Sequence, residues 1–434
     1  MTKRKVSFET LGCRYNQFET AEMAHEMEKS GFVFTQAGER SDVVVINTCA
    51  VTAKSGARCR AAIRKAREEH PGAEVVVAGC YSETSPEQVA GEVGVSLVLG
   101  NVEKFGLASA LASLDSGSAS KIMVGGANGA TAQLAVRPVT SIEGRTNAYI
   151  KAQSGCGEQC SYCIVRVARG KSVSADPDEI VAQIRRISEA GVKEIVFTGI
   201  NLGEYRSKDG LDLAGLVKKT LDETPIPRIR LSSVNPQLVT DELIELMATS
   251  PRVCRHLHVP LQSGSDAILA RMRRPYTATQ YEALLNRLAE KIPGIGIGAD
   301  VMVGFPGETQ EDFEKTRSLI ERSPIMALHI FIYSPRSGTE AFGMSGRPLK
   351  DVSKARSATL KKLSVEKRER AGEKFIGQRL DVLAENTRTD GGQLKGFSDN
   401  YHPVTFDGPD ELMNRIVSVR ITQASGAGLG GEVS

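Results

Sequence analysis

The sequence lacks any apolar run long enough to cross a membrane. Its longest apolar stretches lie at residues 43–46, 75–78 and 327–333, whereas a membrane-spanning helix needs roughly 18 to 20 apolar residues. It also lacks an apolar segment near its start, where Glu9 stands in place of the apolar part of a signal peptide. We therefore expect a cytoplasmic protein with no membrane partner.

The chain also lacks a strong excess of charge of either sign. It has 55 Lys and Arg against 52 Asp and Glu, a net charge of +3, which permits a nucleic-acid partner without requiring one. With 41% hydrophobic and 25% charged residues, the composition excludes a disordered or fibrous protein. The length of 434 residues suggests about three domains.

The first 115 residues alternate between strand-like and helix-like segments, which is typical of an open parallel α/β sheet. Strands are predicted at residues 5–10, 42–47, 74–78 and 96–99, and helices at 17–29, 55–69 and 105–113. The following stretch, 116–131, is rich in Gly, Ala and Ser. It is predicted to be a surface insertion or linker.

The remainder predicts a second α/β region and a small β domain. Six strand and helix units between about 146 and 343 predict a partial (β/α)6 barrel. Its strands are expected at residues 148–153, 194–198, 228–233, 256–261, 296–303 and 327–333. Short strands near the C-terminus, at 379–384, 404–406 and 415–421, predict a small β-barrel. We expect domains at 1–140, 141–371 and 372–434.

A C-x3-C-x2-C motif of Cys156, Cys160 and Cys163 follows the first predicted barrel strand. In a reducing compartment cysteines are better interpreted as ligands, catalytic thiols or buried residues than as disulfides. Three thiolates on one tight loop can ligate three irons of a 4Fe-4S cluster and leave the fourth iron open to a small molecule. Zinc is disfavoured because it needs four closed ligands, and His256 and His258 are distant in the sequence.

A second set of cysteines, Cys13, Cys49 and Cys80, follows three predicted parallel strands of the first domain. The carboxyl ends of parallel strands meet at one sheet edge, so the three thiols should converge there. A second three-cysteine iron-sulfur cluster is the favoured interpretation, and unrelated buried cysteines are the alternative. Cys59 and Cys254 have no partner spacing and are predicted to be ordinary buried residues.

Two further patterns are interpreted as structural. His256 and His258 alternate along a strand and so share a face; we expect packed or hydrogen-bonded histidines, with substrate contact by His258 as the alternative. The glycines at 426, 428 and 431 match a dinucleotide fingerprint formally, but no strand closely precedes them and no helix follows. This segment is predicted to be a flexible tail.

The C-x3-C-x2-C motif at the end of the first strand of a partial barrel resembles the radical S-adenosylmethionine (SAM) enzymes. The resemblance implies that the open iron binds SAM, which an external electron donor then helps cleave to a 5′-deoxyadenosyl radical. Tyr162 fits the position that packs near the adenine. Further implied cofactor contacts follow later strands: Gly199, Asn201, Gly203, Ser232, Ser233, Gln262, Gly304 and Pro306.

Two cysteine triplets followed by a small β domain resemble the methylthiotransferase family over nearly the whole chain. Segments 10–17, 47–52 and 397–401 are most similar to the branch that modifies N6-threonylcarbamoyladenosine at position 37 of tRNA. The family implies that the N-terminal cluster holds sulfur from a sulfur donor, that the radical removes hydrogen from C2 of the adenine, and that a second SAM donates the methyl group. The chain departs from the family at Arg166, where proline is usual.

The family also implies how RNA is held. The C-terminal barrel resembles the TRAM domain, which implies RNA binding, so the tRNA anticodon loop is the expected partner. The turn 399–401 and the basic segment 347–370 are expected to hold the tRNA, with a solvated helix face as the alternative for the basic segment.

Two alternatives use the same chemistry on another substrate, either N6-isopentenyladenosine in tRNA or an aspartate of a ribosomal protein. The acidic last domain favours the protein substrate slightly. An alternative of another class is a non-catalytic iron-sulfur protein that binds RNA as a redox sensor.

Overall fold

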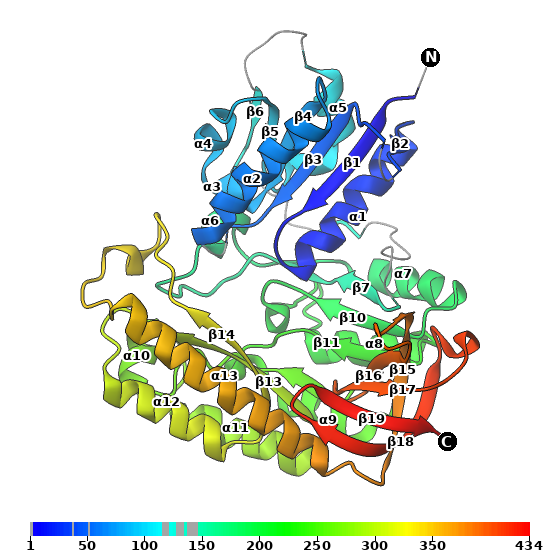
Figure 1. Cartoon of the computed structure of the whole chain (residues 1–434), viewed down its shortest axis with the longest axis vertical. Coiled ribbons are helices and arrows are strands. Elements are labelled where there is room, and N and C mark those ends of the chain that lie inside the picture. The colour runs from blue at the N-terminus through cyan, green and yellow to red at the C-terminus, as the bar shows by residue number, and fades with distance from the viewer. Residues whose placement is uncertain (1–2, 37–38, 51–52, 115–120, 127–133, 137–145) are drawn as a thin grey trace. The chain divides into compact units, whose positions relative to one another are not determined.

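The computed structural model describes residues 3–36, 39–50, 53–114, 121–126, 134–136 and 146–434 (Figure 1). The chain divides into two compact units. The first contains Met1–Val139, Ser154–Val173 and Ser334–Phe342, and the second contains Thr140–Gln153, Ser174–Tyr333 and Gly343–Ser434. The cysteine motif of the barrel loop therefore belongs to the first unit, while the three domain boundaries stay a prediction. Among the described helices, none has the length and apolar character that crossing a bilayer needs.

The first unit is built on a parallel six-stranded sheet in the order β2-β1-β3-β4-β5-β6. Its strands are β1 (Lys5–Thr10), β2 (Val33–Phe34), β3 (Val43–Thr48), β4 (Glu74–Gly79), β5 (Val95–Leu99) and β6 (Lys121–Met123). Its helices are α1 (Arg14–Lys29), α2 (Ala53–Glu69), α3 (Cys80–Thr84), α4 (Pro86–Ala90), α5 (Leu107–Ala112), α6 (Val165–Arg169) and the 3-10 turn η1 (Glu103–Gly106). The predicted open α/β sheet is confirmed.

Helices cover both faces of this sheet, which is why β3 is buried along its whole length. Val43 and Val45 face a core that contains Met27 of α1 and the residues of α5. On the opposite face, α2 contributes Cys59, which is fully buried. Burial raises the pKa of the Cys59 thiol to about 12, so Cys59 is the ordinary core residue that the sequence predicted.

The predicted linker at 116–131 contains a strand that the sequence analysis missed. Residues 121–123 form β6, which pairs in parallel with Leu97–Leu99 at the sheet edge. Residues 121–123 have larger side chains than the Gly, Ala and Ser residues around them, and such side chains are compatible with an extended strand. The remainder of the predicted linker lies outside the described residues, except for residues 124–126.

The second unit contains the predicted partial barrel. Its strands are β7 (Ala148–Lys151), β10 (Glu194–Thr198), β11 (Arg228–Leu231), β12 (His256–His258), β13 (Gly296–Val303) and β14 (Ile325–Ile332). They form two parallel sheets, β11-β10-β7 and β12-β13-β14, and a bridge between Ser233 and His258 joins them. The helices are α7 (Pro177–Glu189), α8 (Leu213–Glu223), α9 (Asp241–Thr249), α10 (Asp266–Arg271), α11 (Ala278–Lys291) and α12 (Gln310–Arg322). A two-stranded sheet of β8 (Gln153–Ser154) and β9 (Val173–Ser174) flanks the cysteine loop.

A closed five-stranded barrel follows the long helix α13 (Lys350–Glu373), as Figure 1 shows in orange and red. Its strands are β15 (Arg379–Arg388), β16 (Leu394–Ser398), β17 (Pro403–Phe406), β18 (Ile416–Ser425) and β19 (Gly428–Val433). The predicted flexible tail is wrong, because β19 pairs with both β17 and β18 and closes the barrel. Its glycines permit close packing: a Cβ at Gly431 would collide with the carbonyl oxygen of Arg420.

The turn at 398–402, which the sequence predicts to hold tRNA, makes several contacts with the partial barrel. Arg230 of β11 donates to the carbonyl oxygens of Ser398 and Asp399 at 3.0 and 2.9 Å. Its guanidinium also lies 4.6 Å from the centre of the Tyr401 ring, and that ring lies 4.4 Å from His256. The turn is therefore docked on strands of the partial barrel, and its contact with RNA stays a prediction. His256 is the packed histidine that was predicted.

Part of the basic segment is likewise used inside the protein. Arg356 of α13 forms a buried ion pair with Glu308 at 2.7 Å. Lys367 donates to the carbonyl oxygens of Glu321 and Ser323 at the end of α12, and burial lowers its pKa to about 8. The basic side chains that remain exposed to solvent are Arg347, Lys350, Lys354, Lys361, Lys362 and Arg370.

Candidate functional site

The N-terminal cysteines lie at one edge of the first sheet. Cys13 is the N-cap of α1 directly after β1, Cys49 follows β3, and Cys80 opens α3 after β4. Since β1, β3 and β4 are neighbours in the sheet, the three cysteines share its carboxyl edge. A Cβ at Gly12 would lie 2.5 Å from Cys49 Cβ, so the residue before Cys13 touches Cys49 and has to be glycine.

Two polar side chains fasten these strand ends to one another. Asn16 donates from its amide to the carbonyl oxygens of Leu11 and Thr48, at 3.0 and 2.8 Å. The hydroxyl of Thr48 donates in turn to the carbonyl oxygen of Ala78 at 2.6 Å. The ends of β1, β3 and β4 are thus held together by side chains whose roles the sequence analysis missed, although both residues lie in its quoted motifs.

The C-x3-C-x2-C loop is short and internally bonded. The backbone N–H of Cys156 donates to the carbonyl of Gly170, and that of Cys163 donates to the carbonyl of Cys160. All three cysteines are partly exposed. Arg166, at the position where the family resemblance implies a proline, lies within helix α6, and the N–H of Gly170 after this helix donates to the carbonyl of Arg166. The loop is therefore ordered without the proline.

The first unit brings the two cysteine sets next to each other. Cys80 packs in one apolar cluster with Ala50, beside Cys49, and with Ile164 and Ala168 from the C-x3-C-x2-C loop. The amide of Asn101 donates both to Cys80 Sγ, at 3.6 Å, and to the carbonyl of Ala168, at 2.6 Å. Asn101 therefore links the sheet edge to helix α6. Nothing in the local sequence pattern marks it.

A buried ionic network also joins the loop to the sheet domain. Glu19 of α1 lies between Lys104, at 2.7 Å, and Arg169 of α6, at 2.9 Å. Arg169 further donates to Asn16 at 2.9 Å. Burial opposes the charged form of Arg169, but attraction to negative charge on the Cys80 sulfur and on the Glu19 carboxylate holds its pKa above the usual value. The network fixes the loop against the helix that begins at Cys13.

We expect Glu19→Gln to lower the free energy of unfolding by about 3 kcal/mol, because it leaves two buried cations without their shared carboxylate. Urea unfolding of the apoprotein measures this loss. Glu282→Gln is the matched control: it removes an exposed ion pair with Arg322, which contributes no more than about 1 kcal/mol. Equal losses in the two variants would show that the network does not stabilise the unit.

The first group of predicted cofactor contacts lies after β10 in the second unit. The backbone N–H of Asn201 donates to Gln153 Oε1 at 2.9 Å. A Cβ at Gly199 would lie 2.8 Å from the same oxygen, and a Cβ at Gly203 would lie 2.6 Å from Leu238 Cβ. Both glycines thus permit close packing, and their contact with a cofactor stays a prediction.

A second group lies where β11 and β12 meet. Ser233 is bridged to His258, and the backbone N–H of Gln262 donates to the carbonyl of Asp300 at 2.8 Å. Gln262 has a left-handed φ of 63°. The hydroxyl of Ser232 is buried and has no hydrogen-bond partner among the described residues. A buried hydroxyl without a partner suits a polar ligand, so Ser232 fits the predicted role.

Gly304 and Pro306 have clear structural roles. Gly304 donates its N–H to the carboxylate of Glu308 at 2.6 Å, and a Cβ there would collide with Ser353 of α13. The carbonyl of Pro306 accepts a hydrogen bond from Arg271 at 3.0 Å. These contacts explain why the sequence has these residues, and cofactor contact by them stays a prediction.

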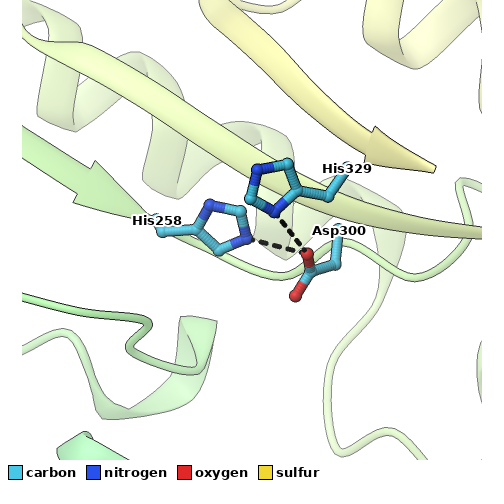
Figure 2. A group of neighbouring side chains, drawn as sticks. All are labelled: His258, Asp300 and His329. Carbon is cyan, nitrogen blue, oxygen red and sulfur yellow. Dashed lines mark ion pairs between the residues drawn. The ribbon is translucent and has the colours of Figure 1, made fainter. Parts of the chain in front are cut away.

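Three side chains of the partial barrel form a polar cluster that the sequence indicated only in part (Figure 2). His258 Nε2 lies 3.0 Å and His329 Nδ1 lies 3.4 Å from the same carboxylate oxygen of Asp300. Burial alone would raise the pKa of Asp300, but hydrogen bonds from both imidazoles hold it well below its usual range. His258 is thus the hydrogen-bonded histidine that was predicted. Asp300 and His329 were missed because they come from separate strands.

The donor sets fit the implied cofactors. Thiolates are the ligands of iron-sulfur clusters, and sets of three leave one iron of each 4Fe-4S cluster open. The loop supplies Cys156, Cys160 and Cys163 with partial exposure, as binding of a small molecule at the open iron requires. Tyr162, which lies between Cys160 and Cys163 in the sequence, is partly buried. In the second set Cys13 is exposed and Cys80 is buried.

Comparison with known proteins identifies the family. The radical SAM superfamily model matches residues 150–320, and the model described as "Uncharacterized protein family UPF0004" matches residues 5–100. The chain is 34% identical to threonylcarbamoyladenosine tRNA methylthiotransferase MtaB of Bacillus subtilis, over 96% of this chain and 94% of that protein. It is 35% identical to the protein of the same name from Thermotoga maritima, over 98% and 96%.

A third relative carries a different name. The tRNA-2-methylthio-N(6)-dimethylallyladenosine synthase of Geobacter sulfurreducens is 33% identical over 100% of this chain and 98% of that protein. Among solved structures, the radical SAM methyltransferase TsrM from Kitasatospora setae matches with a TM-score of 0.57 at 16% identity, over 89% of this chain and 79% of that one. That likeness concerns the fold alone. On its full-length similarity, the chain belongs to the radical SAM methylthiotransferase family, in its MtaB branch.

Proposed function

We propose that this enzyme transfers a methylthio group to C2 of N6-threonylcarbamoyladenosine at position 37 of tRNA. The observation that carries the proposal is the similarity over nearly the full chain to methylthiotransferases named for threonylcarbamoyladenosine, at 34% and 35% identity. Relatives named for dimethylallyladenosine make that substrate the alternative. The packing of both cysteine sets within one unit supports a reaction that uses both together.

The enzyme uses SAM and two 4Fe-4S clusters. Cys156, Cys160 and Cys163 would hold the cluster that binds SAM. When bound, this cofactor pair supplies a radical that removes a hydrogen atom from an unactivated carbon. The buried hydroxyl of Ser232 would form a hydrogen bond with SAM. An external electron donor is required as a partner.

The second cluster would be held by Cys13, Cys49 and Cys80. The hydrogen bond from Asn101 orients the Cys80 sulfur, and Arg169 places a buried positive charge close to it. A positive charge stabilises thiolates and the anionic cluster that they bind. We assign to this cluster the storage of the sulfur atom, which an external sulfur donor replenishes.

The RNA has to present a single base to the barrel. A nucleotide in the anticodon loop is already poorly paired, so moving it out of its stack costs less than from a duplex, by a few kcal/mol. The exposed basic residues of α13 and its leading segment, between Arg347 and Arg370, can contact phosphates. Binding should therefore weaken as salt rises.

The substrate is tested with the reconstituted holoenzyme and two tRNAs, one with N6-threonylcarbamoyladenosine and one with N6-isopentenyladenosine at position 37. Mass spectrometry of the digested nucleosides should find a 2-methylthio group on the first and none on the second. Modification of the isopentenylated tRNA alone would contradict the proposed substrate. A 2-methylthio group on neither tRNA, together with one on a ribosomal protein, would contradict a tRNA substrate.

A further inference from the structure

His258, Asp300 and His329 lie side by side on three neighbouring parallel strands, β12, β13 and β14 (Figure 2). In the strand register, Gly298 is paired with His258, and Asp300 is paired with His329. Gly298 and Asp300 are two residues apart and so point to the same face of the sheet. We call these three side chains the His-Asp-His cluster.

The cluster faces away from the helix-covered side of the sheet. On β13, the intervening residues Ala299 and Val301 are fully buried among apolar side chains, whereas Asp300 keeps 23% of its side chain exposed. Gly298 makes room for the cluster, because a Cβ there would lie 2.6 Å from His258 Nδ1. The glycine at position 298 therefore leaves space for the imidazole of His258 on this face of the strand.

The hydrogen bonds fix how the two rings are oriented. Ionised Asp300 only accepts, so His258 Nε2 and His329 Nδ1 carry the hydrogens that point to its Oδ1 atom. The two rings lie 4.9 Å apart at an interplanar angle of 31°. The His258 side chain is 12% exposed, but that of His329 is 68% exposed. His329 is thus the solvent-exposed member of the cluster, and Nε2 is its ring nitrogen that does not face Asp300.

The cluster is continuous with the residues predicted to contact SAM. Ser233 is bridged to His258, and the N–H of Gln262 donates to the carbonyl of Asp300. Because Ser233 and Gln262 are predicted SAM contacts, a substrate base that reacts with SAM would lie near the cluster. The cluster is therefore in a position to contact the N6 substituent of that base.

We propose that the His-Asp-His cluster is the subsite for the N6-threonylcarbamoyl group, with His329 donating a hydrogen bond from Nε2 to its carboxylate. This assignment rests on the proposed function and goes beyond it by naming the group that selects the substrate. In its imidazolium form His329 donates from both nitrogens, to Asp300 on one side and to the substrate on the other.

The same arrangement rejects an apolar substituent. A dimethylallyl group has no polar atom that could form a hydrogen bond with His329 or Asp300. It would also displace the water that solvates both side chains. Sites built to hydrogen-bond a substrate group discriminate against analogues that lack the group, because the polar atoms of the site then lose their hydrogen-bond partner. The cluster therefore accounts for a preference between the two tRNA substrates found among the relatives.

The test pairs a change in the enzyme with a change in the substrate. Anticodon stem-loop RNAs carry either N6-threonylcarbamoyladenosine or its methyl ester, which removes the carboxylate charge. With the wild-type holoenzyme, the ester should lower kcat/KM for methylthiolation about 10- to 100-fold, the range for a hydrogen bond to a charged group. In His329→Ala, the ester and the acid should react within about threefold of each other, since their partner is gone.

Three controls separate recognition from damage. The iron content of His329→Ala should equal that of the wild type, because the replaced side chain is 68% exposed and is no cluster ligand. His329→Gln, which keeps a donor, should recover part of the preference for the acid. Ile332→Ala changes an exposed side chain on the other face of β14, and it should keep the full wild-type penalty for the ester.

The contradicting outcomes are distinct. If the wild-type enzyme modifies the acid but His329→Ala keeps the same ester penalty, the subsite is wrong and the proposed function stands. If the wild-type enzyme modifies dimethylallyl RNA and not the acid, the proposed function is wrong and the subsite falls with it. One divalent metal ion per chain, bound by the holoenzyme and lost in Asp300→Asn, would make the cluster a metal site and overturn the subsite.

Discussion

Replacing Cys160 with Ala should abolish the formation of 5′-deoxyadenosine from SAM by the anaerobically reconstituted protein. Cys160 is the middle residue of a loop with only three cysteines, and its loss leaves two ligands for a cluster that needs three. The rate of 5′-deoxyadenosine formation with a chemical reductant measures the effect. We expect a fall to the level of the reaction without enzyme.

Cys59→Ala is the matched control for this experiment. Cys59 is a fully buried cysteine in the helix-covered core of the same unit, and its replacement costs some stability but removes no predicted ligand. This variant should keep its iron and its rate of cleavage. Undiminished 5′-deoxyadenosine in Cys160→Ala would rule out the loop as the site of the SAM-binding cluster.

Replacing Cys49 with Ala should separate the two clusters. Cys49 belongs to the set at the sheet edge, so the variant should lose about half of the bound iron, that of one of two 4Fe-4S clusters. Cleavage of SAM should remain measurable because the loop cysteines are unchanged, whereas methylthiolation of tRNA should be lost. Iron analysis, 5′-deoxyadenosine and modified nucleosides are measured on the same preparation.

The opposite result would be equally clear. If Cys49→Ala kept its full iron content and formed the full amount of product, the three cysteines at the sheet edge would be buried residues and no cluster ligands. Loss of all iron would instead show that the two clusters depend on each other for assembly. Neither result would change the assignment of the loop cysteines, which the Cys160 variant tests separately.

The strands that carry the cysteines could be predicted because their signals are local. Residues 5–10 and 296–303 were predicted with the bounds that β1 and β13 have. In β1 the apolar Val6 and Phe8 alternate with polar residues, whereas most residues of β13 are apolar or small; both patterns are local signals of a strand. Once the strands are known, parallel pairing places Cys13, Cys49 and Cys80 at one edge without further information.

Strands β6 and β19 were not predicted. β6 is only three residues long and lies in a stretch rich in Gly, Ala and Ser, and the Gly-rich sequence of β19 resembles a loop. Residues 428–433 contain three glycines, and a strand of this kind is stabilised by partners on both sides more than by its own side chains. Gly431 is needed because β18 approaches closely. Local propensity is overruled here by closure of the barrel.

Contacts between distant segments account for the other failures. The sequence predicted the turn with Tyr401 only as a tRNA contact and did not show that Arg230 of the partial barrel, remote in the sequence, binds this turn. In the same way Arg169 meets Glu19 across 150 residues of sequence. Asp300 and His329 share no motif with His258. The residue pattern of one segment cannot predict such contacts, because it carries no information on which elements lie next to each other in the fold.

The most direct test of the whole account uses tRNA in which C2 of N6-threonylcarbamoyladenosine at position 37 carries deuterium. After reaction with the holoenzyme, mass spectrometry should find one deuterium in 5′-deoxyadenosine for each 2-methylthio group formed on the base. This result requires the SAM-binding loop, the sulfur-bearing cysteines and the substrate base to act at one carbon atom. A methylthiolated base with no deuterium in 5′-deoxyadenosine would contradict the account.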